Sequence, residues 1–211
     1  MILEAKGLSF SYDPVVPLIQ EWDASFAAGE VVAITGRSGR GKSTLLYLLG
    51  LMLKAQAGEV RLGGVEVSRW SDSRRASLRA HQFGFVFQDA ALDPTRTVLD
   101  NVIETALYRR EPRAKTEIVA RELLEQFGVD LRSGARPGQV SGGQAQRIAL
   151  CRALVNRPRV LLADEPTGNL DQTSADVVIR AFHNHAKTGA AVIVVTHDPA
   201  LVAQCDRSLA L

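Results

Sequence analysis

The sequence predicts an α/β fold with a parallel core sheet. Four short runs rich in apolar and β-branched residues are continuous rather than alternating, which is typical of strands covered on both faces. These runs are Val31–Thr35, 83–87, 160–163 and 191–196. Helical periodicity over 143–155 and 174–187 places a helix before each of the last two runs. Such alternation of helix and strand indicates the α/β class.

The remaining segments predict additions to this core. Leu3–Phe10 and 58–67, which contains a Gly63-Gly64 turn, predict antiparallel strands at one edge. A helix is expected after Lys42, and helical periodicity returns over 98–108 and 115–127. Because 94–137 contains no strand-like run, it predicts a helical insertion. We therefore expect one domain over 1–211, with a core of about 1–88 and 138–211, a helical subdomain of about 89–137, and a terminal strand over 208–211.

Composition excludes several classes of protein. The 211 residues carry a net charge of +2 and are 46% hydrophobic, which disfavours a disordered chain or a dedicated polyanion binder, so no nucleic-acid partner is expected. Cys151 and Cys205 are far apart and predict core residues rather than a disulfide or zinc site. No apolar stretch is long enough to cross a bilayer, and the N-terminus lacks a signal-peptide pattern. We expect a cytosolic chain.

Some polar residues are predicted to lie on the surface without a functional role. The basic stretch after Val67 predicts a solvated helix face, and the histidines within helical patterns are expected to be exposed. These residues are Arg69, Arg74, Arg75 and Arg79, and His81, His183 and His185.

The strongest motif is the glycine-rich segment 36–43, which fits the pattern G-x-x-x-x-G-K-[ST]. It follows one predicted strand and precedes a helix, so successive backbone N–H groups can surround phosphate oxygens. Lys42 would add a positive charge at the β and γ phosphates, and Ser43 a hydroxyl for Mg²⁺. The predicted nucleotide-binding residues here are Gly36, Arg37, Ser38, Gly39, Arg40, Gly41, Lys42, Ser43 and Thr44.

A carboxylate pair ends the predicted strand 160–163. Asp164 and Glu165 would lie at the carboxyl edge of the sheet, where open α/β sheets bind ligands. Asp164 is expected to hold Mg²⁺ through its coordination shell. Glu165 lies one residue further and is expected to orient or deprotonate the water that attacks the γ-phosphate.

A second candidate phosphate site begins the helix over 143–155. Ser141 is a natural N-cap, and Gly142 and Gly143 expose N–H groups to an anion. One nucleotide needs a single phosphate loop from its own subunit. The spare site, with Ser141, Gly143 and Gln144, therefore predicts that two chains meet head to tail and cap each other's nucleotide.

These motifs, in this order, resemble those of ATP-binding cassette (ABC) ATPase subunits, and the resemblance covers about 2–211. The ordered motifs are 36–43, Phe87-Gln88, Ser141-Gly142-Gly143-Gln144, Asp164-Glu165-Pro166, Gly168-Asn169-Leu170-Asp171 and His197. The resemblance implies the P-loop NTPase fold of that family. It also implies that Tyr12 stacks on adenine, that Gln88 contacts a Mg²⁺-bound water, that His197 donates to the γ-phosphate and that Asp171 contacts the partner chain. Glu165, His197 and Lys42 form the implied catalytic set, with ATP and Mg²⁺ as cofactors.

Within the family, the segments 43–46, 83–88 and 164–171 are similar to the bacterial group of lipoprotein-release, macrolide-export and cell-division ATPases. This resemblance implies an integral-membrane permease subunit as partner, a homodimer or a pair with a second ATP-binding subunit, and a peripheral location on the inner face of the membrane. Val140 and the segment 89–97 depart from the group's pattern and leave the partner and substrate open. An alternative is mechanotransmission, in which the same ATPase activates an extracytoplasmic enzyme.

Overall fold

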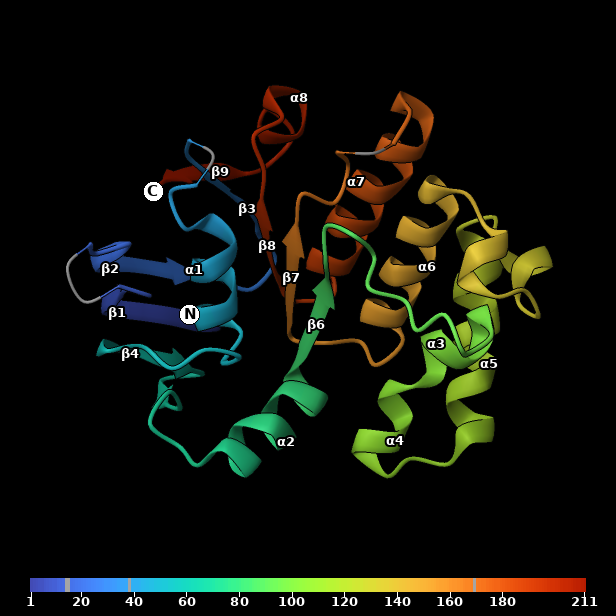
Figure 1. Cartoon of the computed structure of the whole chain (residues 1–211), viewed down its shortest axis with the longest axis horizontal. Coiled ribbons are helices and arrows are strands. Elements are labelled where there is room, and N and C mark those ends of the chain that lie inside the picture. The colour runs from blue at the N-terminus through green and yellow to red at the C-terminus, as the bar shows by residue number, and fades with distance from the viewer. Residues whose placement is uncertain (14–15, 38, 169) are drawn as a thin grey trace.

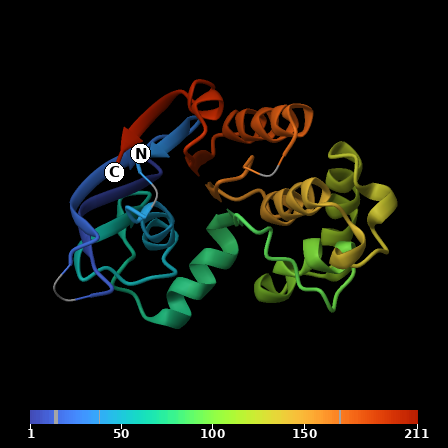
Figure 2. The ribbon, with the colours of Figure 1, turned by 45° about the horizontal axis from the view of Figure 1, so that its top comes forward.

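The computed structural model describes residues 1–13, 16–37, 39–168 and 170–211. Figure 1 shows an antiparallel sheet on one side, a parallel sheet in the middle and a group of helices on the other side. Figure 2 shows the same division after rotation, with the helical group at the end opposite the antiparallel sheet. The predicted α/β class, with its parallel sheet and antiparallel edge, is confirmed.

The parallel sheet has the strand order β6-β7-β8-β3-β9. Its strands are β3 (Val31–Thr35), β6 (Phe83–Val86), β7 (Val160–Asp164), β8 (Ala191–Val195) and β9 (Arg207–Ala210), and all the pairs are parallel. Every residue of β7 and β8 is buried, which explains the continuous apolar runs in the sequence. The carboxyl ends of β3, β7 and β8 therefore lie at one edge of the sheet.

Each face of the parallel sheet is covered by different elements. Alternate residues of one strand take opposite sides: Leu161 packs in the cluster that includes the helices α6 (Gly142–Leu154) and α7 (Gln172–Ala186), whereas Leu162 packs with α1 (Lys42–Leu49). The cluster around α1 also includes the antiparallel sheet. The helix α1 is therefore packed between the two sheets, directly after the loop that follows β3.

The antiparallel sheet has the order β2-β1-β4-β5, with bounds Leu3–Phe10 (β1), Ile19–Phe26 (β2), Ala57–Leu62 (β4) and Val65–Glu66 (β5). The sequence did not predict β2. Its middle residues include Gln20, Glu21 and Asp23, and only Ile19 and Phe26 are buried. Such a strand has little apolar alternation, and it forms because β1 supplies its hydrogen bonds from Leu3↔Phe26 to Phe10↔Ile19.

The helical group lies between β6 and α6 in the sequence. It contains α3 (Val98–Ile103), α4 (Thr105–Arg109), α5 (Arg113–Gln126) and 3-10 turns at Asp130–Arg132 and Pro137–Gln139. Two short helices replace the single helix expected over 98–108, because α3 ends at Ile103 and Glu104 separates it from α4. Elsewhere, α2 (Asp72–Gln82) precedes β6, and α8 (Pro199–Val202) precedes β9. Among the described helices, none is both long and apolar enough to span a bilayer.

Two surface predictions are wrong. In the basic stretch, Arg69 and Arg74 are exposed, but Arg75 is only 8% exposed and donates to Asp72, while Arg79 donates to the carbonyl of Leu51 at 2.7 Å. Arg75 also donates to the carbonyl of Leu53 at 3.4 Å, so both arginines contact carbonyls that follow α1.

The histidines that were predicted to lie on the surface also differ in their exposure. His185 is 9% exposed, its Nε2 lies 2.8 Å from the carbonyl oxygen of Pro158, and burial lowers its pKa. It is therefore a packed residue of α7, not a surface one. His81 is exposed, as expected, and His183 is half-buried and contacts the carbonyl of Gln204. Both cysteines are free, Cys151 is buried and Cys205 is half-buried.

Candidate nucleotide and catalytic site

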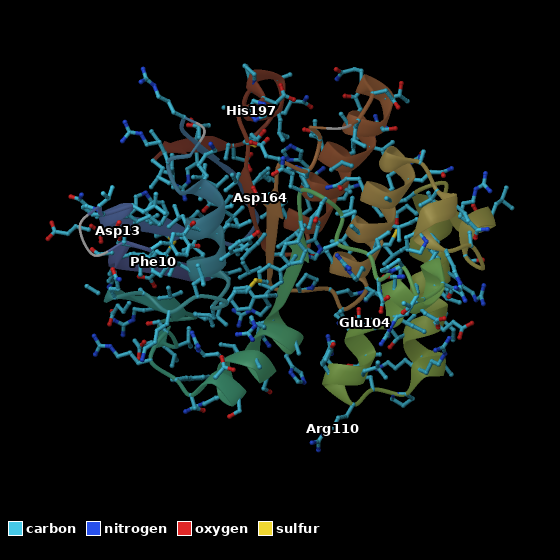
Figure 3. All side chains as sticks on the ribbon, viewed as in Figure 1. Phe10, Asp13, Glu104, Arg110, Asp164 and His197 are labelled. Carbon is cyan, nitrogen blue, oxygen red and sulfur yellow. The ribbon has the colours of Figure 1, made fainter. Side chains whose placement is uncertain are left out.

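A cavity of about 700 Å³ opens at the carboxyl ends of β3, β7 and β8. Figure 3 shows two of its residues, Asp164 and His197, at that end of the central strands. The structure brings most of the predicted nucleotide and catalytic residues together here. They are Tyr12, Gly36, Arg37, Gly39, Gly41, Lys42, Ser43, Thr44, Gln88, Asp164, Glu165 and His197. Leu18 and Val195 add apolar surface to the lining.

The phosphate loop is held closed by Lys42, the first residue of α1. Its ammonium donates to the carbonyls of Gly36 at 2.9 Å and Arg37 at 3.1 Å, so the loop wraps around a buried positive charge. Gly41 precedes the helix with φ 90°, and a Cβ there would lie 2.8 Å from Leu18. Only glycine fits this position. The free N–H groups at the start of α1 and the Lys42 charge together make an anion site.

Among the described residues of this predicted loop, Arg40 alone does not line the cavity. Arg40 is exposed, and its backbone N–H donates to the Arg37 carbonyl at 3.3 Å. Ser38 lies outside the described residues. The predicted roles of both in nucleotide binding stay predictions.

Asp164 offers a buried oxygen atom suited to a metal ion. Its side chain is 2% exposed, and Oδ1 has no hydrogen-bond partner among the described residues. Burial raises the pKa of Asp164; Glu165 adds to that effect, and a hydrogen bond from Ser43 and the charge of Lys42 oppose it. The described residues form no cluster of three or more His, Cys, Asp or Glu side chains around a metal position. A Mg²⁺ ion that takes the remaining ligands from phosphates and water fits this arrangement.

Glu165 is fixed by three contacts across the sheet edge. It adopts the left-handed φ of 44°, and its backbone N–H donates to the Val195 carbonyl at 2.9 Å. Its carboxylate accepts from the Thr196 hydroxyl at 3.1 Å and lies 2.7 Å from His197 Nδ1. Glu165 is largely buried, whereas the His197 side chain is 74% exposed. Thr196, which the sequence indicated only as the end of a strand, thus orients the candidate base.

Tyr12 and Gln88 both line the cavity. The Tyr12 hydroxyl is 3.4 Å from the Thr44 hydroxyl, and its ring packs edge-on against Phe10 with a centroid separation of 4.8 Å. Because the residue remains 69% exposed, a face of the ring is open to a planar base. Gln88 follows β6, is exposed and lines the cavity beside Asp164.

The second candidate phosphate site lies outside this cavity. Ser141 caps α6: its hydroxyl accepts from the Gln144 N–H at 3.3 Å, and the Gln144 side chain accepts from the Ser141 N–H at 3.0 Å. Gly143 lies near Leu170, where an added Cβ would be 3.4 Å from that side chain. Asp171 caps α7 by accepting from the Ser174 N–H at 2.9 Å. None of Ser141, Gly143 and Gln144 lines the cavity around Lys42.

A phosphate loop between a parallel strand and a helix, with a carboxylate pair on a neighbouring strand, defines a P-loop nucleotide-binding protein. The profile described as "ABC transporter" matches residues 19–168, so the chain belongs to the ABC transporter family. It is an ATP-binding cassette that hydrolyses ATP, as the motifs predicted.

Individual proteins that resemble this chain are members of the same family. The chain is 44% identical to the lipoprotein-releasing system ATP-binding protein LolD of Bordetella pertussis, over 98% of this chain and 91% of that protein. It is 42% identical to the macrolide export ATP-binding/permease protein MacB 1/2 of Paracoccus denitrificans, over 98% of this chain and 31% of that protein. The dimeric structure of MJ0796, a bacterial ABC transporter cassette, superposes with a TM-score of 0.92 at 30% identity, covering 100% of this chain and 94% of that one. The dimeric structure of MJ0796 in a post-hydrolysis state, bound to ADP and Pi, superposes on this chain with a TM-score of 0.90.

Proposed function

We propose that this chain is a Mg²⁺-dependent ATPase subunit that closes as a dimer around two ATP molecules and drives an integral-membrane permease. The observation that carries the proposal is the separation of the two anion sites. The Lys42 loop lines the cavity, whereas the capped start of α6 at Ser141 does not. A second chain arranged head to tail would place its Ser141 helix end over this cavity.

The polar and aromatic residues of the cavity divide the chemical roles in this proposal. The phosphate loop and Lys42 bind the β and γ phosphates, and Tyr12 stacks on the adenine. Ser43, Asp164 and Gln88 would hold Mg²⁺, which neutralises phosphate charge when bound. Glu165 accepts a proton from the attacking water, and its contacts with Thr196 and His197 fix its orientation. His197 is exposed enough to turn from Glu165 toward the γ-phosphate and donate a hydrogen bond there.

In the dimer, the start of α6 would act on the partner chain's nucleotide. Ser141, Gly143 and Gln144 present a hydroxyl and backbone N–H groups at a helix N-terminus, which attracts phosphate oxygens. Asp171 is proposed to contact the partner near its phosphate loop. The likeness to a cassette solved as a dimer supports this assembly.

A second groove supports a membrane partner. This cavity of about 900 Å³ is lined by residues of α2, β6, α4 and α6, among them Phe83, Phe85 and four arginines: Arg79, Arg109, Arg110 and Arg152. Its mixture of aromatic and charged lining suits an amphipathic helix of a permease subunit. We propose that the subunit is peripheral on the inner face of the membrane, and that its permease acts in a process of the kind named for these relatives, which is lipoprotein release for LolD and macrolide export for MacB.

Size-exclusion chromatography with light scattering tests the dimer. Glu165→Gln, which slows hydrolysis, is expected to change from monomer to dimer when ATP is added and to remain a monomer with ADP. Adding Ser141→Arg should keep the double variant monomeric with ATP, while fluorescence titration shows unchanged ATP affinity at its own cavity. A dimer that forms without nucleotide, or one that tolerates Ser141→Arg, would contradict the proposal. Purification of this chain from membranes in mild detergent, followed by identification of the subunit bound to it, tests whether its partner is an integral-membrane permease.

A further inference from the structure

The segment that follows Gln88 has an unusual backbone. Ala90 and Ala91 both adopt left-handed conformations, with φ 61° and 46°. Residues with a Cβ rarely adopt this region, and two in succession require support from outside the turn. A hydrogen bond from the Ala90 N–H to the Phe87 carbonyl, at 3.1 Å, closes the turn on itself. This single bond leaves the carbonyls of Ala90 and Ala91 to be satisfied by another part of the chain.

Arg152 on α6 supplies that support. One guanidinium nitrogen donates to the Ala91 carbonyl at 2.6 Å, and the other donates to the Ala90 carbonyl at 2.7 Å. A planar fork can satisfy two adjacent carbonyls in fixed geometry, which a lysine ammonium cannot do. Gln146 on the same helix donates to the Phe87 carbonyl at 3.3 Å. The backbone on both sides of Gln88 is thus tied to α6, along which the green segment after β6 runs in Figure 1.

Arg152 also borders the groove described above. It lines the 900 Å³ cavity together with Glu104, the one carboxylate residue in its lining among the described residues. The negative charges of Glu104 and Asp89 act on the Arg152 guanidinium. Arg152 therefore contacts the carbonyls behind Gln88 on one side and borders the groove on the other. A carboxylate placed in the groove would compete with the Ala90 and Ala91 carbonyls for the same guanidinium.

We propose that Arg152 is a positioning residue for Gln88: its forked hydrogen bonds hold the strained turn at 90–91 and so set where the Gln88 side chain lies in the nucleotide cavity. Because the guanidinium borders the groove, a carboxylate-bearing helix docked there would compete for it and loosen this turn. The effect on catalysis rests on the proposed role of Gln88 at the metal. The tether, meaning the two hydrogen bonds from Arg152 to the Ala90 and Ala91 carbonyls, does not depend on that role.

Hydrogen–deuterium exchange of the nucleotide-free chain tests the tether. In Arg152→Ala, the Ala90 amide is expected to exchange about tenfold faster, because two charge-assisted bonds that stabilise the turn are lost. Arg147→Ala is the matched control, since Arg147 lies on the same helix and donates to the Phe127 carbonyl at 3.2 Å. It should leave Ala90 exchange unchanged. Equal exchange of Ala90 in the wild-type chain and Arg152→Ala would overturn the proposal.

Steady-state ATPase assays at varied Mg²⁺ test the link to Gln88. Arg152→Ala is expected to raise the Mg²⁺ concentration for half-maximal turnover about tenfold, and Arg152→Lys to behave in the same way because it keeps the charge but lacks the fork. ATP affinity without Mg²⁺ should not change. Rescue to wild-type Mg²⁺ dependence by Arg152→Lys, or faster Ala90 exchange without any Mg²⁺ effect, would refute the positioning role. If the wild-type chain shows no Mg²⁺-dependent turnover, the proposed function fails, and the exchange result still decides whether the tether exists.

Discussion

His197 Nδ1 lies 2.7 Å from the Oε1 atom of Glu165, while the Thr196 hydroxyl donates to the other carboxylate oxygen at 3.1 Å. Two consecutive residues after β8 therefore hold a single carboxylate at the end of β7. The left-handed φ of Glu165 turns the chain at the point where these contacts form. These contacts within the protein orient the carboxylate, which lowers the reorganisation needed for proton transfer.

Glu165→Gln should reduce kcat by about 10²–10⁴-fold, because the amide cannot accept a proton from water. ATP affinity should be unchanged, since the phosphate loop is intact. Enzyme-coupled phosphate release and fluorescence titration measure the two quantities. Glu125→Gln, an exposed residue of α5, is the matched control and should behave like the wild-type chain. Unchanged turnover in Glu165→Gln would refute its role as the base.

Thr196→Val should lower kcat by about tenfold while leaving ATP affinity unchanged. The substitution keeps the side-chain shape and removes the hydroxyl that orients Glu165. The effect should disappear in the Glu165→Gln background, because Thr196 acts through the carboxylate. Additive losses of turnover in the double variant would show that Thr196 acts independently.

Lys42→Ala should raise the Kd for ATP by about 10–100-fold. The change removes a charge from the phosphate site and the two hydrogen bonds that close the loop onto Gly36 and Arg37. Isothermal titration calorimetry at fixed ionic strength measures the Kd. The exposed Lys54 offers a control of equal charge change, and Lys54→Ala should bind ATP normally. Normal affinity in Lys42→Ala would contradict the assignment of the phosphate loop.

Asp164→Asn should raise the melting temperature of the Mg²⁺-free chain near neutral pH. Burial raises the pKa of Asp164 above its usual value of 3.8, so folding favours the protonated form. The contribution of Asp164 to the free energy of unfolding is therefore largest below the ordinary carboxyl pKa, and it is lost as pH rises through the raised pKa. Thermal unfolding at several pH values should show the variant's advantage growing over that window. If Asp164→Asn melts at a lower temperature than the wild-type chain at neutral pH, burial of the charged carboxylate does not destabilise the fold.

Gly84→Ala should destabilise the fold by about 1–3 kcal/mol through overpacking. An added Cβ would lie 2.4 Å from the Ala153 carbonyl oxygen and 2.8 Å from Pro158, where β6 meets the end of α6. Gly134→Ala is the control, because an added Cβ there meets nothing within 4 Å. Urea unfolding of both variants gives the comparison. Equal stability would mean that β6 and α6 can separate without cost.

The sequence predicted features whose signals are local. The phosphate loop is contiguous, and the buried parallel strands read as unbroken apolar runs, so both were found where expected. The strand β2 was missed because its exposed face is polar and its partner β1 stabilises it. The burial of Arg75 and His185 could not be predicted, because carbonyl groups distant in the sequence satisfy them. The roles of Thr196 and Arg152 could not be predicted for the same reason, because their hydrogen-bond partners lie on other elements.

The strand order carries a consequence for synthesis on the ribosome. The strand β3, which leads into the phosphate loop, pairs only with β8 and β9 in the described sheet, and both are encoded near the other end of the chain. A nascent chain that already displays the whole glycine-rich motif has no neighbouring strands to anchor it. Contacts this distant in sequence form slowly and late. The glycine-rich segment therefore gains both of its neighbouring strands only after residues 207–210 have been synthesised, and until then the apolar strand β3 has no sheet to protect it from aggregation.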